Sequence, residues 1–356
     1  MSGPGKPLKL GIIGCGKVAE ERHLPALKMI PEVEVVAAAD IDIDRARLLM
    51  GRFDIDCPCT DYPTLLDRDD LEAVAILTPT LSHKEIGVAA LDAGKHVFLE
   101  KPLALTLDDC DQLIAAAERS PAKIVVGFNL RWHRLVRRAR AFIQTGDLGT
   151  ITAIRSVYSH YRQGEDAPVW HRKRELGGGV TINEGVHHFD LWRYLLNSEV
   201  AEIFSIRRPS QFVEDSINII SASMTNGVLA TAVLAFKTGP TNEVEIYGEA
   251  GRLYLSCYRF DGLEFHPGPV YPGDIRNRLR RVLGSVKDLP RAVQAMRRGG
   301  DFAATFYEIW RHFLDCVHEN IASECTLEDG KRAVQIALAA IDSSDSGLPS
   351  KIEVDS

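Results

Sequence analysis

The chain has 356 residues, of which 45% are hydrophobic and 26% charged, with a formal net charge of -7. These values are those of an ordinary globular protein, and the length is sufficient for two domains. A protein that binds duplex nucleic acid needs a basic surface, so the negative charge argues against nucleic acid as the main partner.

The N-terminal stretch lacks the basic segment, apolar core and cleavage site of a secretory signal. No apolar run approaches the roughly 18 residues that a membrane-spanning helix needs. The seven cysteines are scattered, and Cys57 and Cys59 form the only close pair, without a second pair at zinc spacing. We therefore expect a cytoplasmic protein with reduced thiols, no metal site and no stable membrane insertion.

Residues 8–13 (LKLGII) form an expected buried strand, followed at once by Gly14, Gly16 and Ala19 in a GxGxxA pattern. The first glycine allows a tight turn, the second lets the backbone approach a pyrophosphate, and the small third residue lets the helix pack closely. Glycine-rich turns are common, so the motif alone is weak evidence. Asp40 strengthens it, because this carboxylate ends a second strand where a ribose-binding acid is expected. Together these features predict dinucleotide binding.

Further apolar runs alternate with helical patterns near residues 44–52, 82–93 and 106–119. Continuous apolar runs are typical of parallel strands that are buried on both faces. The expected strands are 54–59, 73–77, 96–99 and 123–127. This order predicts an α/β fold whose residues 1–128 are a Rossmann domain that binds NAD.

Polar residues follow three of these strands, as Thr78-Pro79-Thr80, Glu100-Lys101-Pro102 and Gly127-Phe128-Asn129. Ligands bind beyond the carboxyl ends of the strands in open parallel sheets, so these segments should share one edge. Lys101 has two interpretations: a solvated surface lysine, as most lysines are, or a functional group at the ligand edge.

After residue 130 the pattern changes to long alternating segments separated by turn signals at 225–227 and 238–240. This predicts a second domain of α+β type over residues 129–356, with a large, mainly antiparallel open sheet. Helical stretches near 302–320 and 328–343 follow.

Three glycines at 177–179 precede a helical pattern that begins near Thr181. Asn183 and His187 are four residues apart and share one helix face, while Glu184 and His188 form a rival pair on the neighbouring face. Gly185 within a helix costs about 1 kcal/mol relative to alanine, which predicts close packing there. Alternatively, the histidines only form hydrogen bonds within the protein. A metal site at His187 and Asp190 would lack a third ligand at a familiar spacing.

Residues 266–300 form an expected insertion with two short helices and an apolar stripe at Ile275, Leu279, Val282, Leu283 and Val286. Such a helix covers the protein's own sheet, joins a partner subunit, attracts an anionic substrate or lies on a membrane surface. We expect a packing or subunit element outside the reaction centre, because the spacing is that of a helix buried on one side.

The motifs GCGKVA, Asp40, TPT, EKP, GFNLRW, GGGVTINEGVHHFD and EIYGEAGRL, in this order, resemble the Gfo/Idh/MocA oxidoreductases. The resemblance covers roughly residues 8–260 and resumes in the C-terminal helices. It implies a Rossmann domain followed by an α/β domain whose open sheet often mediates oligomer contacts. It also implies oxidation or reduction of sugars, cyclic polyols or nucleotide-linked sugars with NAD or NADP.

Carried over to this chain, the resemblance makes Lys101 the catalytic acid or base and puts His187 at the family's histidine position. Asn183 stands where the family usually has aspartate. This departure removes a carboxylate that would hold Lys101 charged, so the division of proton transfer between Lys101 and His187 stays open.

Substrate contacts are expected from Trp170 and His171, which precede the glycines. The alternative is that this segment is a surface loop whose tryptophan is half buried. Arg131 and Tyr161 are weaker candidates for substrate contacts. Lys101, Asn183 and His187 complete the expected substrate site. Asp40, Asp42 and Asp44 favour NAD over NADP, since their charge would oppose a 2'-phosphate. The residues expected to contact the cofactor are Gly14, Gly16, Lys17, Val18, Asp40, Thr78, Pro79, Thr80, His83, Glu100, Lys101 and Asn129.

The sequence therefore predicts an NAD-dependent oxidoreductase acting on a secondary hydroxyl or ketone of a sugar, nucleotide sugar or cyclitol, as a homodimer or homotetramer. Two alternatives remain. One is transient oxidation with recycled NAD, leading to epimerisation or glycoside cleavage. The other is a nucleotide-binding sensor without turnover, which would have no need of Lys101 together with His187.

Overall fold

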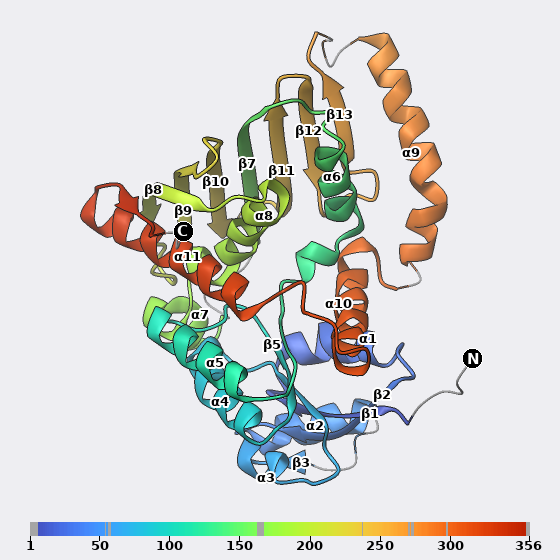
Figure 1. The fold of residues 1–356 in the computed structure, drawn as a ribbon, viewed down its shortest axis with the longest axis vertical. Helices are drawn as coiled ribbons and strands as arrows, with labels where there is room; N and C mark the ends of the chain where they lie inside the picture. Colours follow the sequence, from blue (N-terminus) through green and yellow to red (C-terminus); the bar gives the residue numbers. More distant parts are fainter. Residues whose placement is uncertain are drawn as a thin grey trace. The chain divides into compact units, whose positions relative to one another are not determined.

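The computed structural model describes residues 6–53, 55, 58–161, 167–236, 238–269, 271, 274–296 and 298–353. Cys57, one member of the close cysteine pair, lies outside these residues. The chain divides into two compact units (Figure 1): Met1–Asn129 with Phe306–Val334, and Leu130–Thr305 with Gln335–Ser356. The sequence pattern suggested a division after residue 128, but it did not indicate that residues 306–334 belong to the first unit.

The first unit is built on a six-stranded sheet in the order β3-β2-β1-β4-β5-β6, and its described strand pairs are all parallel. The predicted α/β fold with a parallel sheet is confirmed. The strands after β1 continue on opposite sides of it, so the ligand crevice of such a sheet lies at the carboxyl ends of β1 and β4. The strands are β1 (Leu8–Ile13), β2 (Val33–Ala39), β3 (Pro58–Cys59), β4 (Ala73–Ile76), β5 (His96–Leu99) and β6 (Ile124–Val126).

Two helices of this unit, α3 and α5, begin with a side-chain cap. The Thr106 side chain accepts a hydrogen bond from the Asp109 backbone N–H at the start of α5, and the Asp61 side chain caps α3 in the same way. The segments are η1 (Ala19–His23), α1 (Leu24–Leu27), α2 (Ile43–Phe53), α3 (Tyr62–Leu66), η2 (Thr80–Ser82), α4 (His83–Asp92) and α5 (Leu107–Arg119).

Helix α10 (Asp301–His318) supplies aromatic residues to the core of the first unit from far along the chain. Trp310 stacks on Phe98 of β5 with ring centroids 4.3 Å apart, and Phe313 meets Trp310 edge-on at 5.4 Å. Phe98, Trp310 and Phe313 are fully buried, and such aromatic pairs add to the stability gained from burial alone. The second half of α10 is therefore part of the Rossmann core.

The second unit contains an eight-stranded sheet in the order β13-β12-β11-β7-β10-β9-β8-β14. The pair β7–β10 is parallel and the other described pairs are antiparallel, which confirms the predicted mainly antiparallel sheet. Buried and exposed residues alternate along β9, as expected of a strand with one face on the core. The strands are β7 (Ile151–His160), β8 (Val200–Arg208), β9 (Ile217–Met224), β10 (Leu229–Phe236), β11 (Thr241–Gly248), β12 (Gly251–Ser256), β13 (Leu263–Pro267) and β14 (Ser350–Lys351).

Helix α8 (Val186–Leu196) belongs to the helical layer of this unit. Its Trp192 donates a hydrogen bond of 2.8 Å to the Ser156 hydroxyl on β7. A Cβ at Gly185 would come within 2.9 Å of Leu234 on β10, so the predicted close packing at this glycine is confirmed. The other segments are η3 (Asn129–Trp132), α6 (Arg134–Gln144), α7 (Val169–Arg172), η4 (Arg174–Leu176), η5 (Thr181–Gly185) and α11 (Leu327–Ser346), whose first residues belong to the first unit.

The insertion forms one helix, α9 (Ile275–Met296), with Pro290 inside it, so the prediction of two short helices is wrong (Figure 1). The apolar spacing continues past the proline at Val293 and Met296. The eight large apolar residues of α9 are 48–73% exposed, so the described part of this chain does not bury the stripe. None of the described helices is long and apolar enough to span a bilayer.

Candidate active site

The turn after β1 requires its first glycine and leaves open space at its second. Gly14 has φ +96°, and a Cβ there would lie 2.7 Å from the carbonyl carbon of Leu77. A Cβ at Gly16, in contrast, would meet no atom within 4 Å among the described residues, and helical backbone begins at Lys17. Open space beside a glycine at a helix N-terminus is the arrangement that accommodates a pyrophosphate.

The Asp40 side chain is hydrogen-bonded to the backbone of this turn. One carboxylate oxygen accepts a hydrogen bond of 2.7 Å from the Cys15 backbone N–H, and the other accepts one of 2.9 Å from the Asp42 N–H. A carboxylate oxygen has more than one lone pair, so both retain capacity for a further donor such as a ribose hydroxyl. Burial, and then the charge of Asp40, raise the pKa of the Cys15 thiol to about 12, which keeps this thiol protonated.

The segment after β4 is held by short local contacts. The Ser82 hydroxyl donates to the Thr78 hydroxyl at 2.8 Å, and Thr80 is buried. His83 is only 1% exposed, and its ring nitrogens lie 2.8 Å from the Pro102 carbonyl oxygen and 2.9 Å from that of Thr78. The sequence predicts that His83 contacts the cofactor; in the structure its ring lies between two backbone carbonyls.

The Glu-Lys-Pro turn lies at the carboxyl end of β5. Glu100 is 7% exposed, with one carboxylate oxygen 2.9 Å from His23 Nε2 and the other 3.0 Å from the Lys101 backbone N–H. Lys101 itself is half-buried. The Trp310 indole N–H donates to His23 Nδ1 at 3.1 Å. Sequence reasoning missed His23 and Trp310, because no spacing relates them to each other or to residue 100.

In the second unit, the glycine run lies against α7. Gly177 and Gly179 have φ of +85° and +95°, and a Cβ at Gly178 would overlap the carbonyl oxygen of Trp170. The Gly179 N–H donates to the His171 carbonyl oxygen at 3.2 Å. Gly178 therefore lets the backbone come close to residues 170 and 171, while Gly177 and Gly179 supply positive φ angles on either side of it.

This packing brings together three residues that were expected to bind the substrate, Trp170, His171 and Asn183. The Asn183 side-chain amide donates to His171 Nδ1 at 3.1 Å, and the His171 ring stacks on Trp170 with centroids 3.8 Å apart. Asn183 lies in the π-helical segment η5, not in a regular α-helix as expected, and such segments are frequent at functional sites.

His187 and His188 have different environments. His187 is partly exposed, whereas its neighbours Val186 and His188 are buried. Burial lowers the pKa of His188 to about 4, and its ring nitrogens have no hydrogen-bond partner within the described residues. The rival pair of Glu184 and His188 is therefore buried, and His187 keeps access to solvent.

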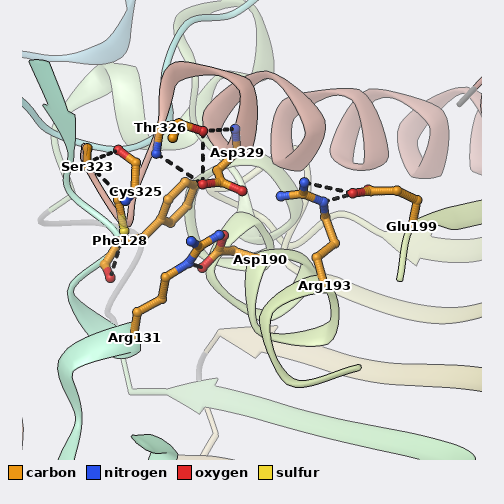
Figure 2. Close-up of polar contacts among 9 residues, drawn as sticks. All are labelled: Phe128, Arg131, Asp190, Arg193, Glu199, Ser323, Cys325, Thr326 and Asp329. Carbon is orange, nitrogen blue, oxygen red and sulfur yellow. Dashed lines mark hydrogen bonds and ion pairs between the residues drawn. The ribbon is translucent and has the colours of Figure 1, made fainter. Parts of the chain in front are cut away.

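Arg131 and Asp190 pair with each other inside the second unit (Figure 2). The guanidinium donates to the two carboxylate oxygens at 2.9 and 2.5 Å, and the residues are 5% and 1% exposed. The predicted substrate role of Arg131 and the metal interpretation of Asp190 both need charged groups that this ion pair occupies. No group of three or more His, Cys, Asp or Glu within the described residues could hold a metal ion.

Two further residues that were expected in the site have opposite environments. Tyr161, a substrate candidate, is 61% exposed, and Asn129, a cofactor candidate, is buried.

A glycine turn after the first strand of a parallel sheet, an acid after the second and a lysine after the fifth define a dinucleotide-dependent enzyme of the Rossmann class. Residues 8–128 match the family model of an oxidoreductase family with an NAD-binding Rossmann fold, and residues 136–254 match the model of the Gfo/Idh/MocA C-terminal domain. The chain belongs to the Gfo/Idh/MocA oxidoreductase family, which confirms the resemblance.

Named relatives act on cyclitols and nucleotide sugars. The chain is 27% identical over 266 residues to myo-inositol 2-dehydrogenase of Thermotoga maritima, covering 71% of this chain and 76% of that protein. It is 30% identical over 252 residues to dTDP-3,4-didehydro-2,6-dideoxy-alpha-D-glucose 3-reductase of Actinomadura kijaniata, covering 70% and 75%. The WlbA dehydrogenase of Bordetella pertussis, solved with NADH and UDP-GlcNAcA, shares the fold with a TM-score of 0.83 at 18% identity, covering 98% of this chain and 99% of that chain.

Proposed function

We propose that this enzyme transfers hydride between NAD and a secondary hydroxyl or ketone of a sugar, nucleotide sugar or cyclitol. The observation that carries the proposal is Lys101 at the carboxyl end of β5, in the same sheet as the open glycine turn after β1. Family members with named substrates, among them an inositol dehydrogenase and a nucleotide-sugar reductase, support this substrate class.

Each proposed residue has a distinct role. When bound, the nicotinamide supplies the hydride acceptor or donor. Gly14, Gly16 and Asp40 hold the dinucleotide, and Lys101 moves the hydroxyl proton in step with the hydride. His187 takes part in proton transfer, and Asn183 orients the substrate or His187. This division follows the family pattern, and the partial exposure of His187 and the contact of Asn183 with His171 support it.

A substrate screen tests the proposal. Sugars, sugar acids, nucleotide sugars and inositols are incubated with enzyme and NAD, and nicotinamide absorbance is followed. We expect reduced nicotinamide to accumulate with at least one cyclic polyol. Conversion of a substrate without net reduced nicotinamide would identify recycled NAD instead, and dinucleotide binding without any conversion would contradict an enzymatic role.

We predict a preference for NAD over NADP. Asp40 accepts hydrogen bonds at the ribose position, and Arg45, the nearest cation in sequence, has its Nε 3.3 Å from the Asp42 carboxylate. Comparing kcat/KM for the two cofactors tests the prediction, and Asp40→Asn should narrow the preference because it removes the charge that opposes a 2'-phosphate. A tenfold preference for NADP, about 1.4 kcal/mol, would contradict it.

We predict that Asn183→Ala lowers kcat/KM by an amount equivalent to about 1–3 kcal/mol, as expected for one buried hydrogen bond. Asn183→Asp should stay active with its pH optimum shifted upward, because the family pattern puts residue 183 beside Lys101 and a carboxylate there holds the lysine proton more tightly. The pH profiles of kcat for wild type and both variants test this. An unchanged optimum in Asn183→Asp would show that residue 183 does not interact electrostatically with the proton-transfer group.

We propose that the enzyme forms homo-oligomers through apolar surfaces of its second unit. Ile206, Ile219 and Val233 form one row across β8, β9 and β10, and they are 36–59% exposed. Helix α9 offers a second such surface with its exposed stripe. Clustered exposed apolar residues are typical of subunit contacts.

Replacing Leu283 and Val286 of α9 with serine should reduce the oligomer mass in solution without changing kcat. Light scattering measures the mass, and Leu348→Ser, at another exposed leucine of the same unit, serves as the control. If the assembly were intact and only the KM of an anionic substrate rose, the insertion would be a substrate-binding lid.

A further inference from the structure

The backbone that carries Lys101 is held by a buried carboxylate. Glu100 accepts hydrogen bonds with both oxygens, from His23 and from the Lys101 backbone N–H. Burial of a carboxylate is costly unless hydrogen bonds replace its lost water contacts. One of these donors belongs to the turn and the other, His23, is fully buried, so Glu100 links the turn at residues 100–102 to the core of the first unit.

The protonation of His23 follows from its other neighbour. An indole nitrogen only donates, so the Trp310 N–H requires His23 Nδ1 to be the acceptor. The proton of a neutral His23 ring is therefore on Nε2, where it donates to Glu100. His23 is fully buried, and the rings of Phe98, Phe306 and Trp310 lie 5.1–5.9 Å from it, so the packing also fixes the ring orientation.

The opposite end of the turn is held by the second histidine. His83 Nδ1 lies 2.8 Å from the Pro102 carbonyl oxygen, and its Nε2 lies 2.9 Å from the carbonyl oxygen of Thr78. Burial lowers the pKa of His83, and a neutral ring donates to one of these carbonyls at a time. The ring therefore connects the turn after β5 to the segment after β4.

We propose that His23 and His83 are positioning residues for Lys101, and that Trp310 sets the hydrogen-bonding direction of His23. With exposures of 0% and 1%, the two rings lie beneath the surface and act through the backbone of residues 100–102. This assignment replaces cofactor contact as the role of His83, and it rests on the proposed role of Lys101.

The test compares variants that keep or lose the donor. His23→Gln retains an amide N–H near the position of Nε2, and His23→Leu does not. Trp310→Phe removes the indole N–H but keeps an aromatic ring at this position. His83→Leu removes both contacts on the other side. His312→Leu is the matched control, because His312 is also buried in the first unit but accepts from the Glu324 N–H, away from the turn.

Each variant is examined in two ways. Steady-state kinetics and NADH titration give kcat, KM and the NADH affinity. Mass spectrometry gives the rate at which acetic anhydride labels Lys101. We expect His23→Leu and His83→Leu to lower kcat at least tenfold, with KM and NADH affinity within twofold, and to raise the labelling rate of Lys101 at least threefold. His23→Gln should recover most of the kcat that His23→Leu loses. The kcat of Trp310→Phe should lie between those of wild type and His23→Leu. The exposed Lys28 should be labelled equally in all variants.

Labelling separates this inference from the proposed function, because it needs no substrate. Unchanged labelling and turnover in both leucine variants, or an equal effect of His312→Leu, would overturn the positioning role. Altered labelling of Lys101 in a protein whose wild type converts no polyol would support the positioning role and contradict the proposed reaction.

Discussion

Replacing Lys101 with alanine should lower kcat by about 10² to 10⁴, equivalent to about 3–5 kcal/mol of transition-state stabilisation. An alanine cannot take or return the hydroxyl proton, so hydride transfer would have to proceed without general acid-base assistance. Dinucleotide affinity should change little, because the phosphate-binding turn and Asp40 lie after other strands of the sheet. Steady-state kinetics and NADH titration measure the two effects separately.

The exposed Lys28→Ala variant controls for loss of a positive charge from the same unit. It should leave kcat unchanged. Near-normal turnover of Lys101→Ala would remove the lysine from the mechanism and leave His187 as the proton-transfer group. A large loss of NADH affinity with normal kcat would instead make Lys101 a cofactor ligand.

Asp190→Ala should reduce the free energy of unfolding by about 3–5 kcal/mol, because it leaves the buried Arg131 guanidinium without this carboxylate. Figure 2 also shows the Arg193–Glu199 pair of the same unit, whose arginine and glutamate side chains are 10% and 29% exposed. Water replaces a lost partner there more easily, so Glu199→Ala should cost about 1 kcal/mol or less.

Chemical denaturation of the two variants gives the comparison. The double variant Arg131→Met with Asp190→Leu should recover much of the loss, since apolar residues of similar volume avoid an uncompensated buried charge. Equal losses for Asp190→Ala and Glu199→Ala would contradict the structural role of the buried pair and reopen a substrate role for Arg131.

The parallel sheet was predictable because buried strands appear as continuous apolar runs, and the glycine turn with Asp40 lies at a fixed place in that pattern. The packing at Gly185 was predictable for a similar local reason, since glycine within a helix is costly unless a neighbour approaches closely. Local rules of this kind depend on residues that are near one another in the sequence.

Contacts between distant residues followed no such rule. Trp310 and His23 are 287 residues apart, and Arg131 and Asp190 are 59 apart. The periodicity of α10 indicates an apolar face but not which sheet that face covers. For Arg131, the same sequence fits a substrate-binding arginine and an arginine in a buried ion pair, and the ion pair with Asp190 appears only in the structure. The sequence did not indicate that α9 continues through Pro290, because a proline inside a helix removes a backbone hydrogen bond and usually interrupts the helix.

Transfer of deuterium from the substrate to the nicotinamide is the most direct test of the proposed hydride transfer. A polyol identified in the screen is labelled with deuterium at each ring carbon in turn, incubated with stoichiometric enzyme and NAD, and the nicotinamide is analysed by NMR. We predict that one labelled position delivers its deuterium to C4 of the nicotinamide in wild type, and that Lys101→Ala does the same at least a hundredfold more slowly. Oxidation of the polyol with no deuterium at C4 would contradict hydride transfer and the account built on it.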